Sequence, residues 1–244
     1  MTSTTLDGGS GQATWAPDEF VAALRSQGGR YHNLHPFHQR MDSGELSREE
    51  LQRWVANRYY YQVAIPLKDA AILSNCPERE VRRVWIQRIL DHDGDRADGG
   101  GIESWLRLGE ALGVGGDVML SEQLVLPGVR YAVDAYVTFC RTRPWIEAVA
   151  ASLTELFGPS AIKVRLEGME KYYPWIDPAG LDYFRNRLRQ APRDAEYALE
   201  LVVARCRTRA EQDRAVDALA FKCDLLWAQL EAIDRGDTRP RASS

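Results

Sequence analysis

The chain has 244 residues, of which 45% are hydrophobic and 27% are charged, and its formal net charge is −4. This is the composition of an ordinary globular protein that is long enough to bury a sizeable core. A slightly acidic chain gives no reason to expect nucleic acid or an anionic membrane as a partner. Any site for an anion must therefore be local, where a few basic side chains converge.

The start of the chain and its cysteines indicate a cellular location. No basic segment followed by an apolar run is present at the N-terminus, so we predict no signal peptide. No apolar stretch approaches the length of a membrane span. The cysteines form no CxxC pair and have no metal-ligand spacing; they are Cys76, Cys140, Cys206 and Cys223. We expect reduced thiols that mostly pack in the core of a cytoplasmic protein.

The first half of the chain carries clear helix-start signals. Residues 1–14 are rich in Ser, Thr and Gly and are predicted to be a disordered tail. Pro17 with two acids after it opens a first helix. Ser47 and Glu50 form a capping box that opens a long second helix. Pro77 lies at the start of a third helix, which Gly94 ends.

The second half continues in the same way. A fourth helix covers about residues 102–112, a fifth starts after Pro127, a sixth opens at Pro144 with an interruption at residues 158–159, and a seventh covers about 181–206. Thr208 and Glu211 form a second capping box, and the last helix reaches about Asp234, before a predicted disordered tail over 235–244. No convincing period-two strand is present. Short links between long helices predict one all-α domain over 15–234, a bundle of about seven or eight helices.

Polar side chains continue the apolar stripes of several helices. Leu51, Trp54 and Val55 define the stripe of the second helix, and Arg58 and Gln62 continue it. The same pattern places these polar residues on the inward faces of other helices: Arg88 and His92 of the third, Tyr136 of the fifth, Glu155 of the sixth and Lys222 of the last. Burying such groups without partners costs about 2–7 kcal/mol each, so together they predict a shared internal cavity.

The charges on these stripes suggest what the cavity binds. Taken alone, an inward Lys or Arg commonly extends its head to solvent, and Glu155 with Arg88 is explained as a buried structural ion pair. Taken together, the inward cations Arg58, Arg88 and Lys222 outnumber the single inward acid. Because Arg binds carboxylates in bidentate fashion, this excess predicts a bound polycarboxylate.

The histidines divide into a cluster and a single residue. His32, His35 and His38 lie in a predicted turn, where a solvated loop is favoured over a metal cluster because no carboxylate has ligand spacing. His92 ends a stripe and is flanked by acids that are expected to favour its imidazolium form. It is the candidate acid–base group, and the alternative is a histidine stabilised by the dipole at a helix C-terminus.

Two further patterns concern metals and the seventh helix. The chain contains no Glu-x-x-His, which argues against a ferritin-like di-iron bundle. Tyr183 and Arg187 are four residues apart and therefore share one helix face. This pair alone is weak evidence for a site, since such pairs are common on solvated faces.

Several long runs that contain rare residues are specific enough to identify a family. They include WVANRYYYQ (54–62), IPLKDAA (65–71), QRILDHDG (87–94), SLTELF (152–157) and YPWI (173–176). In these runs the chain resembles the pyrroloquinoline-quinone synthase family, over about residues 20–232.

The resemblance implies a haem-oxygenase-like bundle that is typically a homodimer. It also implies the last step of pyrroloquinoline quinone biosynthesis, in which a ring is closed on a bicyclic quinone precursor that carries several carboxylates. The product is then oxidised by eight electrons with dioxygen as co-substrate, releasing hydrogen peroxide and using no metal or organic cofactor.

The resemblance also carries functional positions over to this chain. The implied catalytic residues are His92, Tyr183, Arg187 and Lys222. The implied substrate-binding residues are Tyr31, His32, Arg58, Tyr61, Gln62, Arg88, Tyr136, Glu155 and Arg165. One position departs from the family pattern, because Ile162 replaces a second core histidine and cannot relay a proton.

Three alternatives compete with this interpretation. A thiaminase-like hydrolase on the same bundle needs a nucleophilic cysteine at the cavity, for which Cys140 is the candidate. A haem-binding or metal-dependent oxidase would use His32 or His92 as a ligand. A non-catalytic carrier would bind the quinone product without turnover.

Overall fold

The computed structural model describes residues 13–96 and 98–236. These ranges contain α-helices and short 3₁₀ helices and no strand, which confirms the all-α prediction. The α-helices are α1 (Pro17–Ser26), α2 (Pro36–Ser43), α3 (Arg48–Asn75), α4 (Arg79–Asp93), α5 (Gly100–Ala111), α6 (Gly116–Leu120), α7 (Pro127–Thr142), α8 (Trp145–Ala151), α9 (Gly158–Tyr172), α10 (Asp182–Arg205) and α11 (Arg209–Arg235). The 3₁₀ helices are η1 (Gln27–Arg30), η2 (His32–Leu34), η3 (Ser152–Leu156) and η4 (Pro178–Leu181). The predicted tails, 1–14 and 235–244, lie almost wholly outside the described residues.

Local signals position the two longest helices as predicted. The Ser47 hydroxyl accepts a hydrogen bond from the Glu50 amide, and the Glu50 carboxylate accepts one from the Ser47 amide. Thr208 and Glu211 form the same reciprocal pair at the start of α11. Both capping boxes are thus confirmed; each satisfies amide groups that have no partner within the helix.

The described residues form eleven α-helices, more than the seven or eight predicted. Two short helices, α2 and α6, lack the long apolar period on which the prediction relied. The predicted sixth helix is divided into α8 and α9 by the 3₁₀ segment η3, which begins at Ser152. This division matters for the site, because η3 brings Glu155 into the interior.

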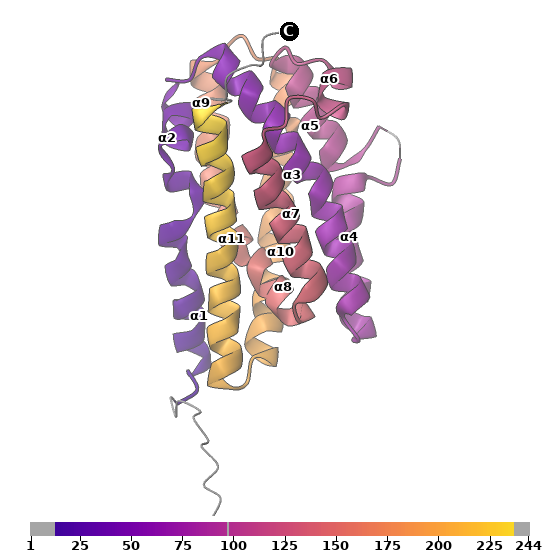
Figure 1. Cartoon of the computed structure of the whole chain (residues 1–244), viewed down its shortest axis with the longest axis vertical. Coiled ribbons are helices and arrows are strands. Elements are labelled where there is room, and N and C mark those ends of the chain that lie inside the picture. Colours follow the sequence, from indigo (N-terminus) through magenta and orange to yellow (C-terminus); the bar gives the residue numbers. More distant parts are fainter. Residues whose placement is uncertain (1–12, 97, 237–244) are drawn as a thin grey trace, which may run out of the picture.

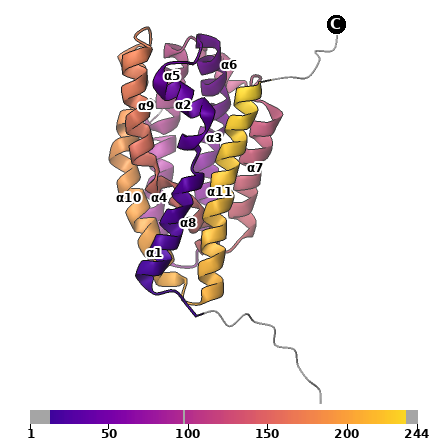
Figure 2. The ribbon, with the colours of Figure 1, turned by 90° about the vertical axis from the view of Figure 1, so that its left-hand side faces the viewer.

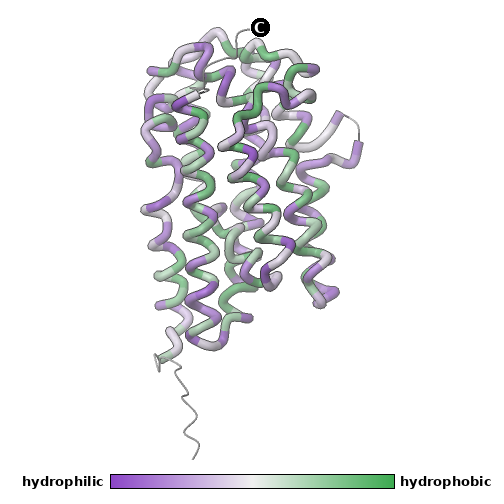
Figure 3. Tube along the Cα trace, in the orientation of Figure 1, coloured by the Kyte–Doolittle hydropathy of each residue, from purple (hydrophilic) through white to green (hydrophobic). Residues whose placement is uncertain are grey.

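The long helices run along the length of the molecule (Figure 1). α3 packs against α4, α5 and α7, whereas α11 packs against α1, α7 and α8. α10 packs against α5, α8 and α9, and α2 lies along α9. Turning the molecule by 90° shows α1 and α11 side by side again (Figure 2). Hydrophobic and hydrophilic residues alternate along these helices, as expected for amphipathic elements (Figure 3).

The apolar interior is divided rather than continuous. One cluster contains Trp54, Trp105 and Phe184, and a second contains Trp85 and Tyr136. A third, much smaller cluster consists of Tyr31, Ala161 and Leu226. Buried polar side chains lie where the three clusters meet, so the core itself forms the walls of an internal cavity. Among the described helices, none is both long and apolar enough to cross a membrane.

The contact between α2 and α9 depends on a glycine. A Cβ atom added at Gly168 would lie 2.5 Å from the carbonyl oxygen of Asp42, closer than a side chain tolerates. The missing side chain lets the two helices approach each other. Arg165, one turn earlier on α9, can therefore bind the carboxylate of Asp42.

Candidate functional site

An internal cavity of about 120 Å³ lies between α2, α3, α4, α5, α7, α9, α10 and α11. Twelve of the thirteen predicted site residues line it: Tyr31, His32, Arg58, Tyr61, Gln62, Arg88, His92, Tyr136, Glu155, Arg165, Tyr183 and Arg187. These residues come from distant parts of the chain, so only the folded bundle brings them together. The convergence of basic and titratable groups in one chamber is the arrangement that the polar stripes predicted.

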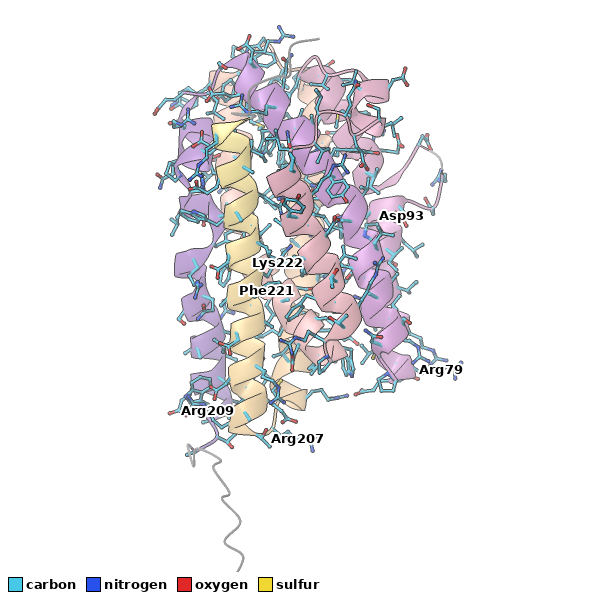
Figure 4. The ribbon with its side chains drawn as sticks, viewed as in Figure 1. Arg79, Asp93, Arg207, Arg209, Phe221 and Lys222 are labelled. Atoms are coloured by element: carbon cyan, nitrogen blue, oxygen red, sulfur yellow. The ribbon has the colours of Figure 1, made fainter. Side chains whose placement is uncertain are left out.

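Lys222 is the exception, because it is not among the residues that line the cavity. It lies midway along α11 (Figure 4) and is 1% exposed. Its Nζ atom is 3.4 Å from the ring centroid of Tyr136 and 4.3 Å from that of Tyr61. Burial, with Lys68 and Arg58 nearby, holds its pKa well below the usual range. Lys222 therefore lies behind two aromatic residues of the wall rather than at the surface of the cavity.

At one end of the cavity, Arg88 lies in a dense ion-pair network. Its guanidinium donates to both carboxylate oxygens of Glu155, at 2.8 and 2.7 Å. Its Nε atom lies 3.3 Å from Asp69, and its Nη1 atom lies 3.5 Å from Asp194. The prediction of a single inward acid is thus wrong. The stripes were followed only as far as Gln62 and Arg187, about two helical turns short of Asp69 and Asp194. The excess of positive charge does not lie at Arg88, whose neighbours neutralise it.

Glu155 links this network to Arg187. The Nη2 atom of Arg187 lies 3.3 Å from the same carboxylate, whose side chain is 19% exposed. Burial alone would raise the pKa of Glu155, but the two guanidinium groups outweigh it and lower this pKa to about 2. Glu155 is therefore a fixed anion that orients two arginines at the cavity wall.

His92 lies beside this network, at the end of α4. Its Nδ1 atom is 3.1 Å from the carbonyl oxygen of Arg88. A carbonyl oxygen only accepts, so Nδ1 carries the proton of the neutral ring and Nε2 keeps a lone pair. Nε2 is buried and has no partner among the described residues.

The expected imidazolium form of His92 is wrong for this structure. Burial, followed by the charge of Arg187, lowers the pKa of His92 to about 4. The flanking acids do not offset this, because Asp91 binds Arg193 and Asp93 is exposed to solvent. A histidine stabilised by the helix dipole would show the opposite shift. His92 is a neutral group with an available lone pair.

The cluster at residues 32–38 is not a solvated loop. His32, His35 and His38 are 7%, 1% and 1% exposed, and residues from Pro36 onward form α2. The buried apolar side chains of Phe37 and Met41 pack this short helix against the core, and the adjacent histidines are buried with it. Two of them, His32 and His38, line the part of the cavity near Arg58 and Arg165, away from the Arg88 network.

This second end carries Arg58 and Arg165. Arg165 is held by Asp42 at 3.1 and 3.4 Å. Arg58 donates to the side-chain carbonyl of Gln229 at 2.8 Å and lies 4.1 Å above the ring of Tyr61. Among the described residues, Arg58 has no carboxylate partner. The unbalanced positive charge of the cavity therefore lies at this end.

Further polar contacts connect the walls of the cavity. The Tyr183 hydroxyl donates to the side-chain oxygen of Gln62 at 3.0 Å. Lys68 donates to the Ser152 hydroxyl at 3.0 Å and lies 2.6 Å from Asp69. These contacts fix the rotamers of the lining side chains, as a preorganised binding site requires.

The structure also shows cavity residues that the sequence reasoning missed. Trp54, Ile65 and Lys68 line the cavity beside the predicted residues of α3. Together with Arg58, Tyr61 and Gln62 they recur every three or four residues along one helix face, so extending the stripe past Pro66 would have found Lys68. His38 gave no such signal, since it was assigned to a turn.

The geometry of the site tests two of the alternative functions, the thiaminase-like hydrolase and the metal-dependent oxidase. Cys140 is fully buried and is not among the cavity-lining residues, and burial raises its pKa to about 11. It is therefore a poor candidate for the nucleophile of a thiaminase-like hydrolase. Within the part of the chain that the structure describes, no group of three or more His, Cys, Asp or Glu residues is placed to hold a metal ion.

Comparisons with known proteins relate this geometry to a family. Residues 21–232 match the model of the TENA/THI-4/PQQC family. The chain is 57% identical over 222 residues to the pyrroloquinoline-quinone synthase of Ectopseudomonas mendocina, covering 91% of this chain and 89% of the relative. It is 54% identical over 231 residues to the protein of the same name from Cronobacter sakazakii, covering 95% and 92%.

A solved structure matches the fold. A Shewanella denitrificans domain described as having a haem-oxygenase-like fold superposes with a TM-score of 0.68 at 13% identity, covering 95% of this chain and all of that one. At this identity the likeness shows the fold alone, and it confirms the predicted haem-oxygenase-like bundle. With a family model that spans most of its length and relatives more than half identical to it, the chain belongs to the TENA/THI-4/PQQC family.

Proposed function

We propose that this chain is a pyrroloquinoline-quinone synthase, which closes a ring on a bicyclic quinone precursor and oxidises the product with dioxygen, releasing hydrogen peroxide. The relatives that carry this name are more than half identical to the chain over most of its length. The observation on which the proposal depends is a buried histidine lone pair in a cavity whose far end has unbalanced positive charge. These are the features that a polycarboxylate needing deprotonation requires.

The carboxylates of the substrate bind at the cationic end. Arg58 has a guanidinium without an ionic partner among the described residues, and Arg165, which is paired with Asp42, also lines the cavity. Arginine binds carboxylates through parallel hydrogen bonds, so these two residues fix the orientation of the ligand. Holding the reacting arm against the ring lowers the entropic cost of ring closure.

Proton removal takes place at the other end. The Nε2 lone pair of His92 takes a proton from the substrate, and the electron pair of the broken bond stays on the quinone ring. The resulting electron-rich anion is then the reductant for dioxygen. Tyr183 and Arg187 lie on the same wall and stabilise the negative charge that develops on oxygen atoms.

Lys222 and Arg88 act through their neighbours in this scheme. Lys222 supports the rings of Tyr61 and Tyr136 from behind. Arg88 holds Glu155, and its backbone carbonyl sets the tautomer of His92. We further propose a homodimer that uses no metal or organic cofactor, as the family resemblance implies, and that works in the cytoplasm, where cysteines stay reduced.

The direct test incubates the purified protein with the bicyclic precursor under air. Oxygen consumption, peroxide release and the product spectrum are followed together. Turnover beyond one equivalent supports the enzyme and rules out the non-catalytic carrier. Formation of no product, with an intact fold, contradicts the proposal. An absorbance scan and metal analysis of the same preparation test the haem- or metal-dependent oxidase.

A further inference from the structure

The cationic end of the cavity contains two histidines that each have a nitrogen without a partner among the described residues, Nδ1 of His32 and Nε2 of His38. His38 is 1% exposed and lines the cavity from α2. Its Nδ1 atom lies 3.0 Å from the carbonyl oxygen of His32. Since the carbonyl can only accept, Nδ1 carries the proton of the neutral ring and Nε2 carries the lone pair.

The Nε2 atom of His38 is buried and has no hydrogen-bond partner among the described residues. A buried polar atom left in this state costs about 1–3 kcal/mol. Native proteins seldom retain such an atom without a reason, and an absent ligand is one. Because His38 lines the cavity, a bound molecule is the available partner.

The charged and titratable groups that face His38 indicate the chemistry of that partner. They are Arg165 on α9, Arg58 on α3 and the neighbouring His32 on η2, with Asp42 of its own helix bound to Arg165. The rings of His32 and His38 meet edge to face, with centroids 4.7 Å apart. The two guanidinium groups draw a carboxylate of the ligand to this end, next to the unused nitrogen.

A neutral Nε2 atom and a carboxylate oxygen are both acceptors, so they form no hydrogen bond with each other. We propose that His38 is a ligand-binding residue, whose Nε2 atom takes up a proton when a polycarboxylate binds and donates a hydrogen bond to one of its carboxylates. The inference rests on the proposed function, which supplies the polycarboxylate quinone.

Electrostatics supports proton uptake on binding. Burial and the charge of Arg165 hold the pKa of His38 well below its usual range. A carboxylate within a few ångströms acts in the opposite direction and favours the charged form. Ligand binding and protonation are thus linked, so product affinity rises as the pH falls.

The test is calorimetric titration of the full-length protein with pyrroloquinoline quinone at pH 7, in phosphate and in Tris. These buffers differ in ionisation enthalpy, so the difference in heat gives the number of protons taken up. The variant is His38→Asn, whose amide nitrogen takes the place of Nδ1 and keeps the bond to the His32 carbonyl. A purely structural role for His38 therefore predicts wild-type behaviour for this variant.

The proposal predicts that His38→Asn takes up about one proton fewer than the wild type and binds the product about tenfold more weakly. His38→Gln, which places an amide nitrogen near Nε2, is expected to bind better than His38→Asn but also without the proton. If His38→Asn fails to fold, proton uptake by His38→Gln is measured instead: its loss supports the proposal, and undiminished uptake overturns it.

The outcomes separate this inference from the proposed function. Unchanged affinity and unchanged proton uptake in a folded His38→Asn protein overturn the role of His38 and leave the proposed function intact. Weaker binding with undiminished proton uptake also overturns it, because the proton then resides elsewhere. A wild-type protein that does not bind the quinone overturns the proposed function itself.

Discussion

Arg88 and Glu155 form a two-bond ion pair across the cavity wall, with N–O distances of 2.8 and 2.7 Å. The pair joins α4 to η3, the short segment that divides the predicted sixth helix. Around it, Asp69, Asp194 and Arg187 complete a buried network. Removing one partner of such a pair leaves a charge buried without compensation, which makes the network a sensitive element of stability.

Glu155→Gln is expected to lower the free energy of unfolding at pH 7 by about 3 kcal/mol, the lower end of the range for a broken buried ion pair, because Asp69 and Asp194 still lie within 3.5 Å of Arg88. The pKa of Glu155 is lowered from 4.5 to about 2. The stabilisation is therefore full above about pH 4.5 and is lost as the pH falls toward 2. Urea unfolding at several pH values measures the difference.

The matched control for this prediction is Glu80→Gln, which breaks an exposed pair with Arg83 on α4. Exposed pairs contribute about 0–1 kcal/mol, so this variant is expected to unfold like the wild type. Two results contradict this account of the network. One is that Glu155→Gln lowers the free energy of unfolding, relative to the wild type, no more than Glu80→Gln does. The other is that the difference between Glu155→Gln and the wild type persists at pH 2.

His92→Asn is expected to reduce kcat by about 10²–10⁴-fold, the contribution of a positioned general base. The asparagine amide keeps the bond to the Arg88 carbonyl but has no basic nitrogen. Since the pKa of His92 is lowered to about 4, the base is neutral throughout the range from pH 8 to 5, and no loss of rate is expected from its protonation there. Oxygen uptake with the precursor under air measures both effects.

If His92→Asn changes neither the rate of oxygen uptake nor the product spectrum, another group removes the proton. The melting temperature of the variant serves as the control for folding.

The folded protein favours the neutral form of His92 over the charged form. The wild type is therefore expected to lose stability as the pH falls from about 6.5 toward 4.

Arg58→Ala is expected to weaken binding of the quinone product by about 1.5–3 kcal/mol, the range for hydrogen bonds to charged groups. The reason is that Arg58 is bound only to Gln229 and Tyr61 among the described residues, so its charge is available to the ligand. Calorimetric titration gives the affinity. Arg83→Ala, at an exposed arginine, is the control, and equal affinities of the two variants would place Arg58 outside the site.

Much of the fold was predictable because its signals are local. Ser47 and Thr208 open the two longest helices through capping boxes that involve residues only three positions away. The helix α2 was not predictable in this way, because it is short and is held by the packing of Phe37 and Met41 against distant segments. Burial of the adjacent histidines follows from that packing, so the prediction of a solvated loop failed.

The site was predictable where polar residues lie on a helix period. Arg58, Gln62, Arg88 and His92 lie on such stripes, and all four line the cavity. The state of charge was not predictable, because it depends on which acids from other helices come within reach. Asp69 neutralises Arg88 only in the folded bundle, where burial also reverses the expected shift of the His92 pKa.

Cys140→Ala is expected to leave oxygen uptake unchanged within about twofold, because Cys140 does not line the cavity and burial raises its pKa to about 11. Iodoacetamide is likewise expected to leave Cys140 unlabelled in the folded protein, which mass spectrometry of the digested protein measures. Labelling of Cys140 that runs parallel to a loss of activity would instead favour the thiaminase-like hydrolase.

Ile162→His tests the position at which this chain departs from its family pattern. Ile162 is half-buried, lines the cavity, and lies one turn before Arg165 on α9. Its side chain neither donates a hydrogen bond nor relays a proton. An imidazole at this place is therefore expected to accelerate the oxidative steps by about tenfold, less than the 10²–10⁴-fold of a fully positioned acid or base.

The measurement separates the two halves of the reaction by loading the precursor without oxygen and then mixing with aerated buffer. Peroxide release after mixing reports the oxidative half, and the spectrum before mixing reports ring closure, which the variant is expected to leave unchanged. Ile162→Ala is the matched control, because it removes the same apolar bulk without adding an imidazole. If both variants release peroxide at the same rate, the isoleucine does not limit proton transfer, and another group of this cavity already supplies it.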